Sequence, residues 1–234
     1  MRFENTEVFN FEGALRGMRN PKESWDKSDT FVGGNSGTDC NCDNCSHVDT
    51  IEIGKNDLKL AQTLIKAGSE HRKFMRQIFV SVDITAPLYW WKEFDTYKVG
   101  TVANSTSTMH KLASTPITRE CFEMDDFEDL NTEQGLESLK EIQWSSLINW
   151  LEDLRRTYNE TKDKRYWKEL IRLLPESWLQ TRTVTMDYEN LLAMCSKGQR
   201  RFHKLTEWSE SFIKWARSLP YAQELIFLDE LEEK

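Results

Sequence analysis

The chain has no apolar run close to the roughly 20 residues that an α-helix needs to cross a bilayer. The N-terminal stretch MRFENTEVF lacks the apolar core of a secretory signal peptide, so we expect a cytoplasmic protein. With 31 Lys and Arg against 39 Asp and Glu, the net charge of −8 argues against nonspecific binding to DNA or to an anionic membrane. The five cysteines are odd in number and three lie close together, which suits a reducing compartment better than a disulfide framework.

The chain also lacks the short motifs that mark the commonest catalytic and nucleotide-binding sites. It contains no G-x-G-x-x-G, no Gly-rich phosphate loop, no H-E-x-x-H and no internal repeat. It also has no pair of Cys-x-x-Cys motifs, because this spacing occurs once. His71, His110 and His203 each lack an identifiable partner, so no Ser/His/Asp or Cys/His catalytic group is assigned. The chain is long enough to bury a core, and its length is compatible with one large domain or two small ones.

A Cys-rich loop is the one candidate metal site. Residues 29–49 are rich in Gly, Asn, Ser and Asp, and they include Cys40, Cys42, Cys45 and His47. Three thiolates and an imidazole are a ligand set that suits tetrahedral Zn²⁺. The spacing C-x-C-x-x-C-x-H is tighter than the usual two separated pairs, so a surface loop without metal is the alternative.

The segment from Gly68 to Leu112 is the stretch around which we expect the rest to be organised. Gly68 ends a helix expected over Asp57–Ala67, and Ile78–Ile84 places apolar residues at the period of a strand. Thr85 is the expected N-cap of the next helix, which ends before VGTVANSTSTMH. That stretch is too rich in Asn, Ser and Thr for a core helix, and it predicts a polar loop that presents hydroxyls and amides to a ligand.

This segment resembles the flavin-dependent thymidylate synthases (ThyX). Members of that family carry an apolar strand, an Ala-Pro, an aromatic-rich helix, R-H-R-x-x-S-x-N-E-x-S-x-R and then K-L. Here Ala86-Pro87 and Lys111-Leu112 frame the same stretch without a gap. The signature positions inside the frame depart from the family. Thr96-Tyr97-Lys98 stand in place of R-H-R, and the later signature positions are occupied by Thr101, Ala103, Asn104, Thr106 and Thr108. The order of elements on both sides is also similar, so the resemblance covers most of the chain.

The resemblance implies a single domain over residues 1–234, with a Cys-rich loop inserted at 29–49. It implies an α+β fold in which an antiparallel sheet is flanked by long helices. It also implies a homotetramer with active sites where subunits meet, and methylation of dUMP, or a related pyrimidine nucleotide, by methylenetetrahydrofolate, with FAD relaying a hydride from NADPH. By position, the cofactor-binding candidates are Tyr97, Lys98, Thr101, His71 and Arg76. The substrate-binding candidates are Asn104, Ser105, Thr106, Ser107, Thr108, His110 and Arg19.

Several of these candidates have a purely structural alternative. Arg72 and Arg76 either fork onto phosphate oxygens or form a solvated basic turn. Arg19 either reaches a phosphate or lies in a solvated lead-in. The pair Trp90–Trp91, at helical spacing, is more typical of a core than of a flavin platform, whereas Tyr97 lies at the end of the helix, where it is better placed to stack on a ligand.

The second half of the chain is expected to be mainly helical. The pattern predicts a long helix from Thr132, a second over about Asp163–Leu174, a strand over Trp178–Thr185, and a helix capped by Asp187 and stopped by Gly198. Two further helices are expected over residues 200–218 and 221–233. A cluster of basic residues at the start of the first either binds an anion or is solvated: Arg200, Arg201, His203 and Lys204.

Three functions are compatible with these observations. The first is a divergent flavin-dependent methylase of a pyrimidine nucleotide. The second is a catalytically inactive protein on the same fold that binds or sequesters a nucleotide. The third is an interaction module whose Cys40–His47 loop is held together by zinc.

Overall fold

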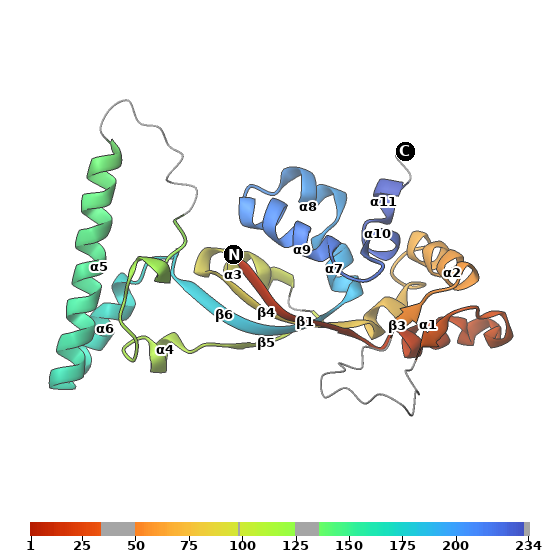
Figure 1. Ribbon diagram of the computed structural model, residues 1–234, viewed down its shortest axis with the longest axis horizontal. Coiled ribbons are helices and arrows are strands. Elements are labelled where there is room, and N and C mark those ends of the chain that lie inside the picture. The colour runs from red at the N-terminus through yellow and green to blue at the C-terminus, as the bar shows by residue number, and fades with distance from the viewer. Residues whose placement is uncertain (34–49, 98, 125–135, 232–234) are drawn as a thin grey trace, which may run out of the picture. The chain divides into compact units, whose positions relative to one another are not determined.

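The computed structural model describes residues 1–33, 50–97, 99–124 and 136–231 (Figure 1). The chain divides into two compact units. Unit 1 comprises Met1–Asn5, Val82–Lys98 and Ala103–Val184, and unit 2 comprises Thr6–Ser81, Val99–Val102 and Thr185–Lys234. The single domain expected from the sequence stays a prediction.

A four-stranded antiparallel sheet with several helices confirms the predicted α+β class. The strand order is β1-β4-β6-β5, with bounds β1 Arg2–Phe9, β4 Phe79–Pro87, β5 Val102–Ser105 and β6 Leu179–Asp187. Val80, Val82 and Ile84 of β4 have no exposed surface, while the residues between them are half-buried. The alternation seen in the sequence therefore marks the strand correctly.

The opposite face of the sheet in unit 1 carries polar cross-strand pairs. Asn5 Nδ2 donates to Asp83 Oδ2 over 2.8 Å, and Thr183 Oγ1 donates to Asp83 Oδ1 over 2.5 Å. The hydroxyls of Thr85 and Thr181 lie 2.7 Å apart. The prediction that Thr85 caps the next helix is wrong, because its hydroxyl is used across the sheet and β4 continues to Pro87, which is the N-cap.

The helix after β4, α3 (Leu88–Phe94), supplies the aromatic core of unit 1. Trp90, Trp91 and Phe94 are at most 2% exposed, and their ring centroids lie 5.0–5.4 Å apart. Trp91 Nε1 donates to the carbonyl of Gln180 over 3.0 Å, and the guanidinium of Arg182 lies 4.2 Å from the Trp91 ring centroid. The interpretation of Trp90–Trp91 as core residues is confirmed.

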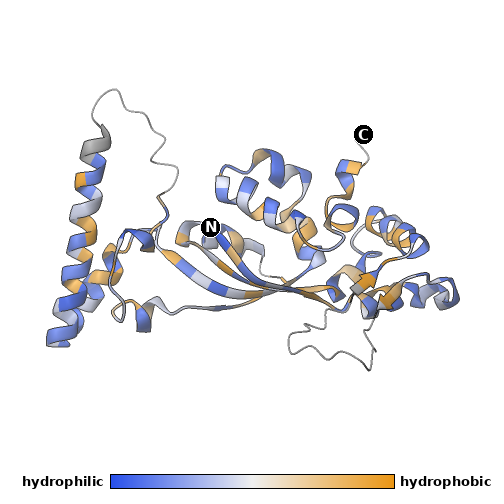
Figure 2. Ribbon diagram, in the orientation of Figure 1, coloured by the Kyte–Doolittle hydropathy of each residue, from blue (hydrophilic) through white to orange (hydrophobic). Residues whose placement is uncertain are grey.

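Two helices that lie side by side form the rest of unit 1, α5 (Leu136–Thr161) and α6 (Lys164–Leu173) (Figure 1). Figure 2 shows apolar and hydrophilic residues alternating around α5. Its inner side joins an apolar cluster that includes Leu151, Leu154 and Leu170. Glu152 lies at the edge of this cluster and accepts from Arg155 Nε and Nη2, both at 2.7 Å, and from the N–H of Ile117 at 2.9 Å. The hydrogen bonds from Arg155 lower the pKa of Glu152 to about 2.

Unit 2 is mainly helical. Gly68 ends α2 as expected, with a φ of +105° that suits glycine. Asp187 caps α7 in a capping box, because its carboxylate accepts from the N–H of Asn190 over 2.8 Å and the amide side chain of Asn190 accepts from the N–H of Asp187. Helices of this unit are α1 Phe11–Arg19, α2 Lys55–Lys66, α7 Tyr188–Met194, α8 Lys197–Phe202, α9 Ile213–Arg217, α10 Ala222–Leu225 and α11 Leu228–Leu231.

Short elements complete the described chain. They are the 3-10 turns η1 Asn20–Lys22, η2 Trp25–Lys27, η3 Lys73–Gln77, η4 Asp95–Tyr97 and η5 Arg119–Cys121, the helix α4 Thr108–Lys111, the π-helical turn η7 Glu207–Phe212 and the strand pair β2 Phe31–Gly33 and β3 Thr50–Glu52. No helix among the described residues is both long and apolar enough to span a bilayer.

Two predictions for the C-terminal region are wrong. Gly198 does not stop a helix, because it lies inside α8, and α7 already ends at Met194. Arg200 and Arg201 therefore lie in the last turn of α8 and not at a helix N-terminus. Arg200 is already neutralised, since its Nη2 donates to Asp229 over 2.7 Å and its Nε lies 3.1 Å from Glu230.

Candidate functional site

The basic turn before β4 is paired with a carboxylate from α7. Arg72 Nε donates to Glu189 Oε1 over 3.1 Å, and Arg76 Nε donates to Glu189 Oε2. The side chain of Glu189 is 13% exposed, and it raises the pKa of Arg76 through a hydrogen bond and through its charge. Neither alternative from the sequence describes this turn fully, because both guanidiniums are held by one internal anion.

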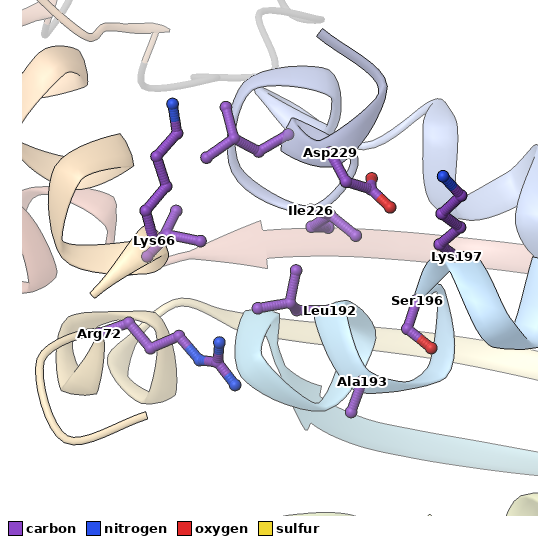
Figure 3. Close-up of a pocket in the computed structure, with 10 residues that line it drawn as sticks. Lys66, Arg72, Leu192, Ala193, Ser196, Lys197, Ile226 and Asp229 are labelled. Carbon is purple, nitrogen blue, oxygen red and sulfur yellow. The ribbon is translucent and has the colours of Figure 1, made fainter. Parts of the chain in front are cut away.

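A cavity of about 330 Å³ lies beside this turn, within unit 2. Figure 3 shows Lys66 and Arg72 on one side of it, Lys197 on the other, and the apolar side chains of Leu192 and Ile226 between them. Lys66 is the last residue of α2, and Lys197 is the first of α8. An apolar floor between cationic walls suits a ligand that has a flat apolar part and an anionic part.

One wall of the cavity contains a buried acceptor that the chain itself does not satisfy. Asp229 Oδ2 accepts from Arg200, whereas Asp229 Oδ1 is buried and has no hydrogen-bond partner among the described residues. A buried carboxylate oxygen left in this way is costly unless a donor reaches it. This oxygen has almost no surface that water can reach, so it faces the protein interior and not the space of the cavity.

The size of the cavity limits what it can hold. Ligand cavities of drug-sized molecules measure roughly 300–1,000 Å³, so 330 Å³ is at the lower end. The residues fit a mononucleotide or one half of a dinucleotide, because they offer cations for a phosphate and apolar surface for a ring. A whole FAD molecule exceeds this volume, so the cavity would hold at most one of its two nucleotide halves.

The predicted substrate-binding residues of the polar segment lie in unit 1 and have a different structure from the expected loop. Asn104 and Ser105 are in strand β5, and together with Thr106 they are exposed in the single chain. The N–H of Thr106 donates to the carbonyl of Thr181 over 2.9 Å, so backbone pairing continues past the strand. The polar composition predicted a loop, but sheet pairing at an edge overrides that preference.

The segment after β5 forms the short helix α4. Ser107 is its N-cap and accepts from the N–H of His110 over 3.1 Å. Thr108 begins α4 and is half-buried, while His110 is exposed. In the described part of the chain, no residue from Asn104 to His110 lines one of the four characterised cavities, so their role as substrate ligands stays a prediction.

The remaining candidates lie at separate places. Tyr97 ends η4 and is half-buried in unit 1, and Thr101 precedes β5. His71 is exposed next to Arg72 at the cavity. Arg19 is buried and its Nε donates to Asp57 Oδ1 over 2.5 Å. Its contact with a nucleotide phosphate stays a prediction, and Asp57 already occupies the Nε edge of its guanidinium.

Two predictions from the sequence concern residues outside the described part of the chain: Lys98, and the proposed zinc ligands Cys40, Cys42, Cys45 and His47. Among the residues that are described, no group of three or more His, Cys, Asp or Glu side chains is placed to hold a metal ion.

Sequence reasoning missed most of the cavity. Lys66, Lys197 and Asp229 carry no motif, and they meet only because α2, α8 and α11 converge in unit 2. The one sequence feature that borders the cavity is the cluster of basic residues at 71–76, through Arg72.

The fold is similar to that of two solved structures. One is the flavin-dependent thymidylate synthase ThyX of Helicobacter pylori complexed with FAD and dUMP, with a TM-score of 0.64 and 16% identity over 98% of this chain and 99% of that chain. The other is Thymidylate Synthase X (ThyX) of the same organism with FAD and dUMP, with a TM-score of 0.62 and 17% identity over 98% of both chains. No protein-family model and no curated protein sequence matches this chain.

Proposed function

We propose that this protein is a divergent flavin-dependent thymidylate synthase-like protein that binds FAD and dUMP or a related pyrimidine nucleotide. The observation that carries the proposal is the likeness of fold over 98% of the chain to structures that hold both molecules. The cavity beside Arg72 supports it, because its cations and apolar floor suit one nucleotide unit. In its catalytic form, the protein methylates the pyrimidine with methylenetetrahydrofolate and NADPH.

The chain's own residues would bind and orient the ligands. Lys66 and Lys197 would attract a phosphate, and Leu192 and Ile226 would exclude water from one face of a ring. A bound flavin supplies hydride transfer, which no side chain can supply, so positioning is the protein's task.

A second candidate is a nucleotide-binding or nucleotide-sequestering protein without turnover. The sequence at the signature positions favours it, since Thr96 and Thr108 stand where the family has arginine. A threonine cannot replace the bidentate contact of a guanidinium with phosphate. Loss of such a desolvated partner costs on the order of 2–5 kcal/mol of binding.

We include a homotetramer and a cytoplasmic location in the proposal. The tetramer follows from the family resemblance, and it would bring the exposed polar residues of β5 against another subunit. The cytoplasm is consistent with the odd number of cysteines.

Two assays separate these functions. Titration of the purified protein with FAD and with dUMP, followed by calorimetry and visible absorbance, measures binding. Release of tritium from C5-labelled dUMP in the presence of NADPH, FAD and methylenetetrahydrofolate measures turnover. Binding with turnover supports the methylase, binding without turnover supports the inactive binding protein, and binding of neither ligand refutes both.

A further inference from the structure

A second cationic cavity lies where η1 and η2 meet the first turns of α2, within unit 2. Its volume is about 470 Å³, and it is lined by Arg19, Lys22, Ser24, Lys27, Asn56 and Leu60. The lining has no carboxylate, and Lys22 and Lys27 carry its net positive charge because Asp57 balances that of Arg19, although the whole chain has a net charge of −8. A local excess of positive charge on an acidic protein concentrates small anions at that place.

Arg19 is held in a fixed orientation at the base of this cavity. Its Nε donates to Asp57 over 2.5 Å, and its Nη1 donates to the carbonyl of Ser24 over 3.1 Å. Asp57 has no exposed surface and is turned inward, where it also accepts from residues 28–30. No described residue accepts a hydrogen bond from Nη2 of Arg19, so that amino group keeps its two N–H donors for a group in the cavity.

The two lysines are carried by an ordered double turn. The N–H of Glu23 donates to Asn20 over 3.1 Å, and the N–H of Lys27 donates to Ser24 over 3.1 Å. Trp25 Nε1 donates to Asn20 Oδ1 over 2.9 Å and links the two turns. Lys22 and Lys27 are therefore presented at the cavity by a preformed backbone, which lowers the entropy cost of binding.

We propose that this cavity binds a small molecule through a diphosphate group. A guanidinium amino group, two ammonium groups, the hydroxyl of Ser24 and the amide of Asn56 are all donors to phosphate oxygen. Asp57 balances the charge of Arg19, so the two lysines supply the net positive charge, and the donors are spread over five side chains, which suits an anion with several phosphate oxygens. Leu60 is the one apolar side chain in the lining, so the cavity selects for charge and not for an apolar ring.

This site shares no lining residue with the cavity beside Arg72. Arg19 is also one of the predicted substrate-binding residues, so the site is tested with a probe that contains neither flavin nor nucleotide.

The test is calorimetric titration of the full chain with inorganic pyrophosphate near physiological salt. The variant is K22E/K27E, and the matched control is K164E/K168E, which makes the same charge change on exposed residues of α6 in unit 1. We expect the wild type and the control to bind pyrophosphate alike, and K22E/K27E to bind about tenfold or more weakly. Circular dichroism checks that each variant is folded. If K22E/K27E does not fold, K22A/K27A is used in its place.

Three results would overturn the proposal: no binding of pyrophosphate by the wild type at millimolar concentration, equal binding by K22E/K27E, or equal weakening by the control pair. Parallel titrations with FAD and dUMP keep the two proposals apart. The second site is supported if K22E/K27E loses pyrophosphate binding and gives the same FAD and dUMP titrations as the wild type. This holds both when the wild type binds FAD and dUMP and when it binds neither.

Discussion

Replacing Asp57 with Asn tests the buried ion pair that fixes the N-terminal part of unit 2. Asp57 is fully buried and Arg19 is 4% exposed, so the pair is shielded from water. The carboxylate accepts from Arg19 Nε at 2.5 Å, from the hydroxyls of Ser28 and Thr30 at 2.6 Å each, and from the N–H groups of Asp29 and Thr30 at 3.3 and 3.2 Å. An amide of the same shape removes the charge and turns an NH₂ group towards some of these donors.

The expected loss is large because it leaves a guanidinium without its counter-charge. Removal of one partner of a buried ion pair costs about 3–5 kcal/mol. The total free energy of unfolding of a protein is about 5–15 kcal/mol, so D57N should remove a substantial fraction of it. Equilibrium unfolding in urea, followed by tryptophan fluorescence and circular dichroism, measures the loss. D26N, at an exposed position of the same loop, should change the free energy of unfolding by less than about 0.5 kcal/mol.

The pH dependence provides an independent check. Burial pushes the pKa of Asp57 upward, but hydrogen bonds from Ser28, Thr30 and Arg19 together outweigh it and hold that pKa below the ordinary 3.8. The stabilisation is therefore complete above the unfolded pKa of about 3.9 and is lost as the pH falls through the lower folded pKa. In D57N this acid-dependent part should disappear. A D57N protein within about 1 kcal/mol of the wild type at neutral pH would refute the reasoning.

Three further predictions use other parts of the structure. Gly54→Ala should lower the free energy of unfolding by about 1–3 kcal/mol, because a Cβ there would lie 2.3 Å from the backbone oxygen of Asp29; a melting temperature equal to that of the wild type would contradict this. Glu152→Gln should lower the free energy of unfolding by about 1–3 kcal/mol near neutral pH. The loss should vanish once the pH falls through the folded pKa of Glu152, about 2, because the wild-type side chain is then uncharged as well; urea unfolding at several pH values measures it. The double variant K66E/K197E should bind dUMP about tenfold or more weakly than the wild type, while the control K164E/K168E should bind it equally well. Equal dUMP affinities of K66E/K197E and the wild type in calorimetry would exclude this cavity as the nucleotide site.

The sequence was most informative where a local signal and the tertiary environment agree. The alternation of Val80, Val82 and Ile84 marked a buried strand because one face of β4 is fully covered. Asp187 was identified as an N-cap because its hydrogen bond to the backbone is local. Gly68 was identified as a helix end because its positive φ is a backbone requirement.

Predictions failed where a distant partner decides the outcome. Thr85 has a good N-cap side chain, but Thr181, far away in the sequence, takes its hydroxyl. Asn104 and Ser105 have poor strand propensity, yet they lie in β5 because β6 offers an unpaired edge. The cavity beside Arg72 could not be predicted for the same reason, since its lysines come from helices that meet only in the folded chain.

The central claim is that this fold binds a flavin and a pyrimidine nucleotide. Its most direct test is the absorbance of the purified protein between about 350 and 500 nm, before and after addition of FAD and dUMP and removal of the unbound ligand. The account predicts a flavin spectrum that stays with the protein. A protein that stays colourless after addition of FAD, with and without dUMP, would contradict it.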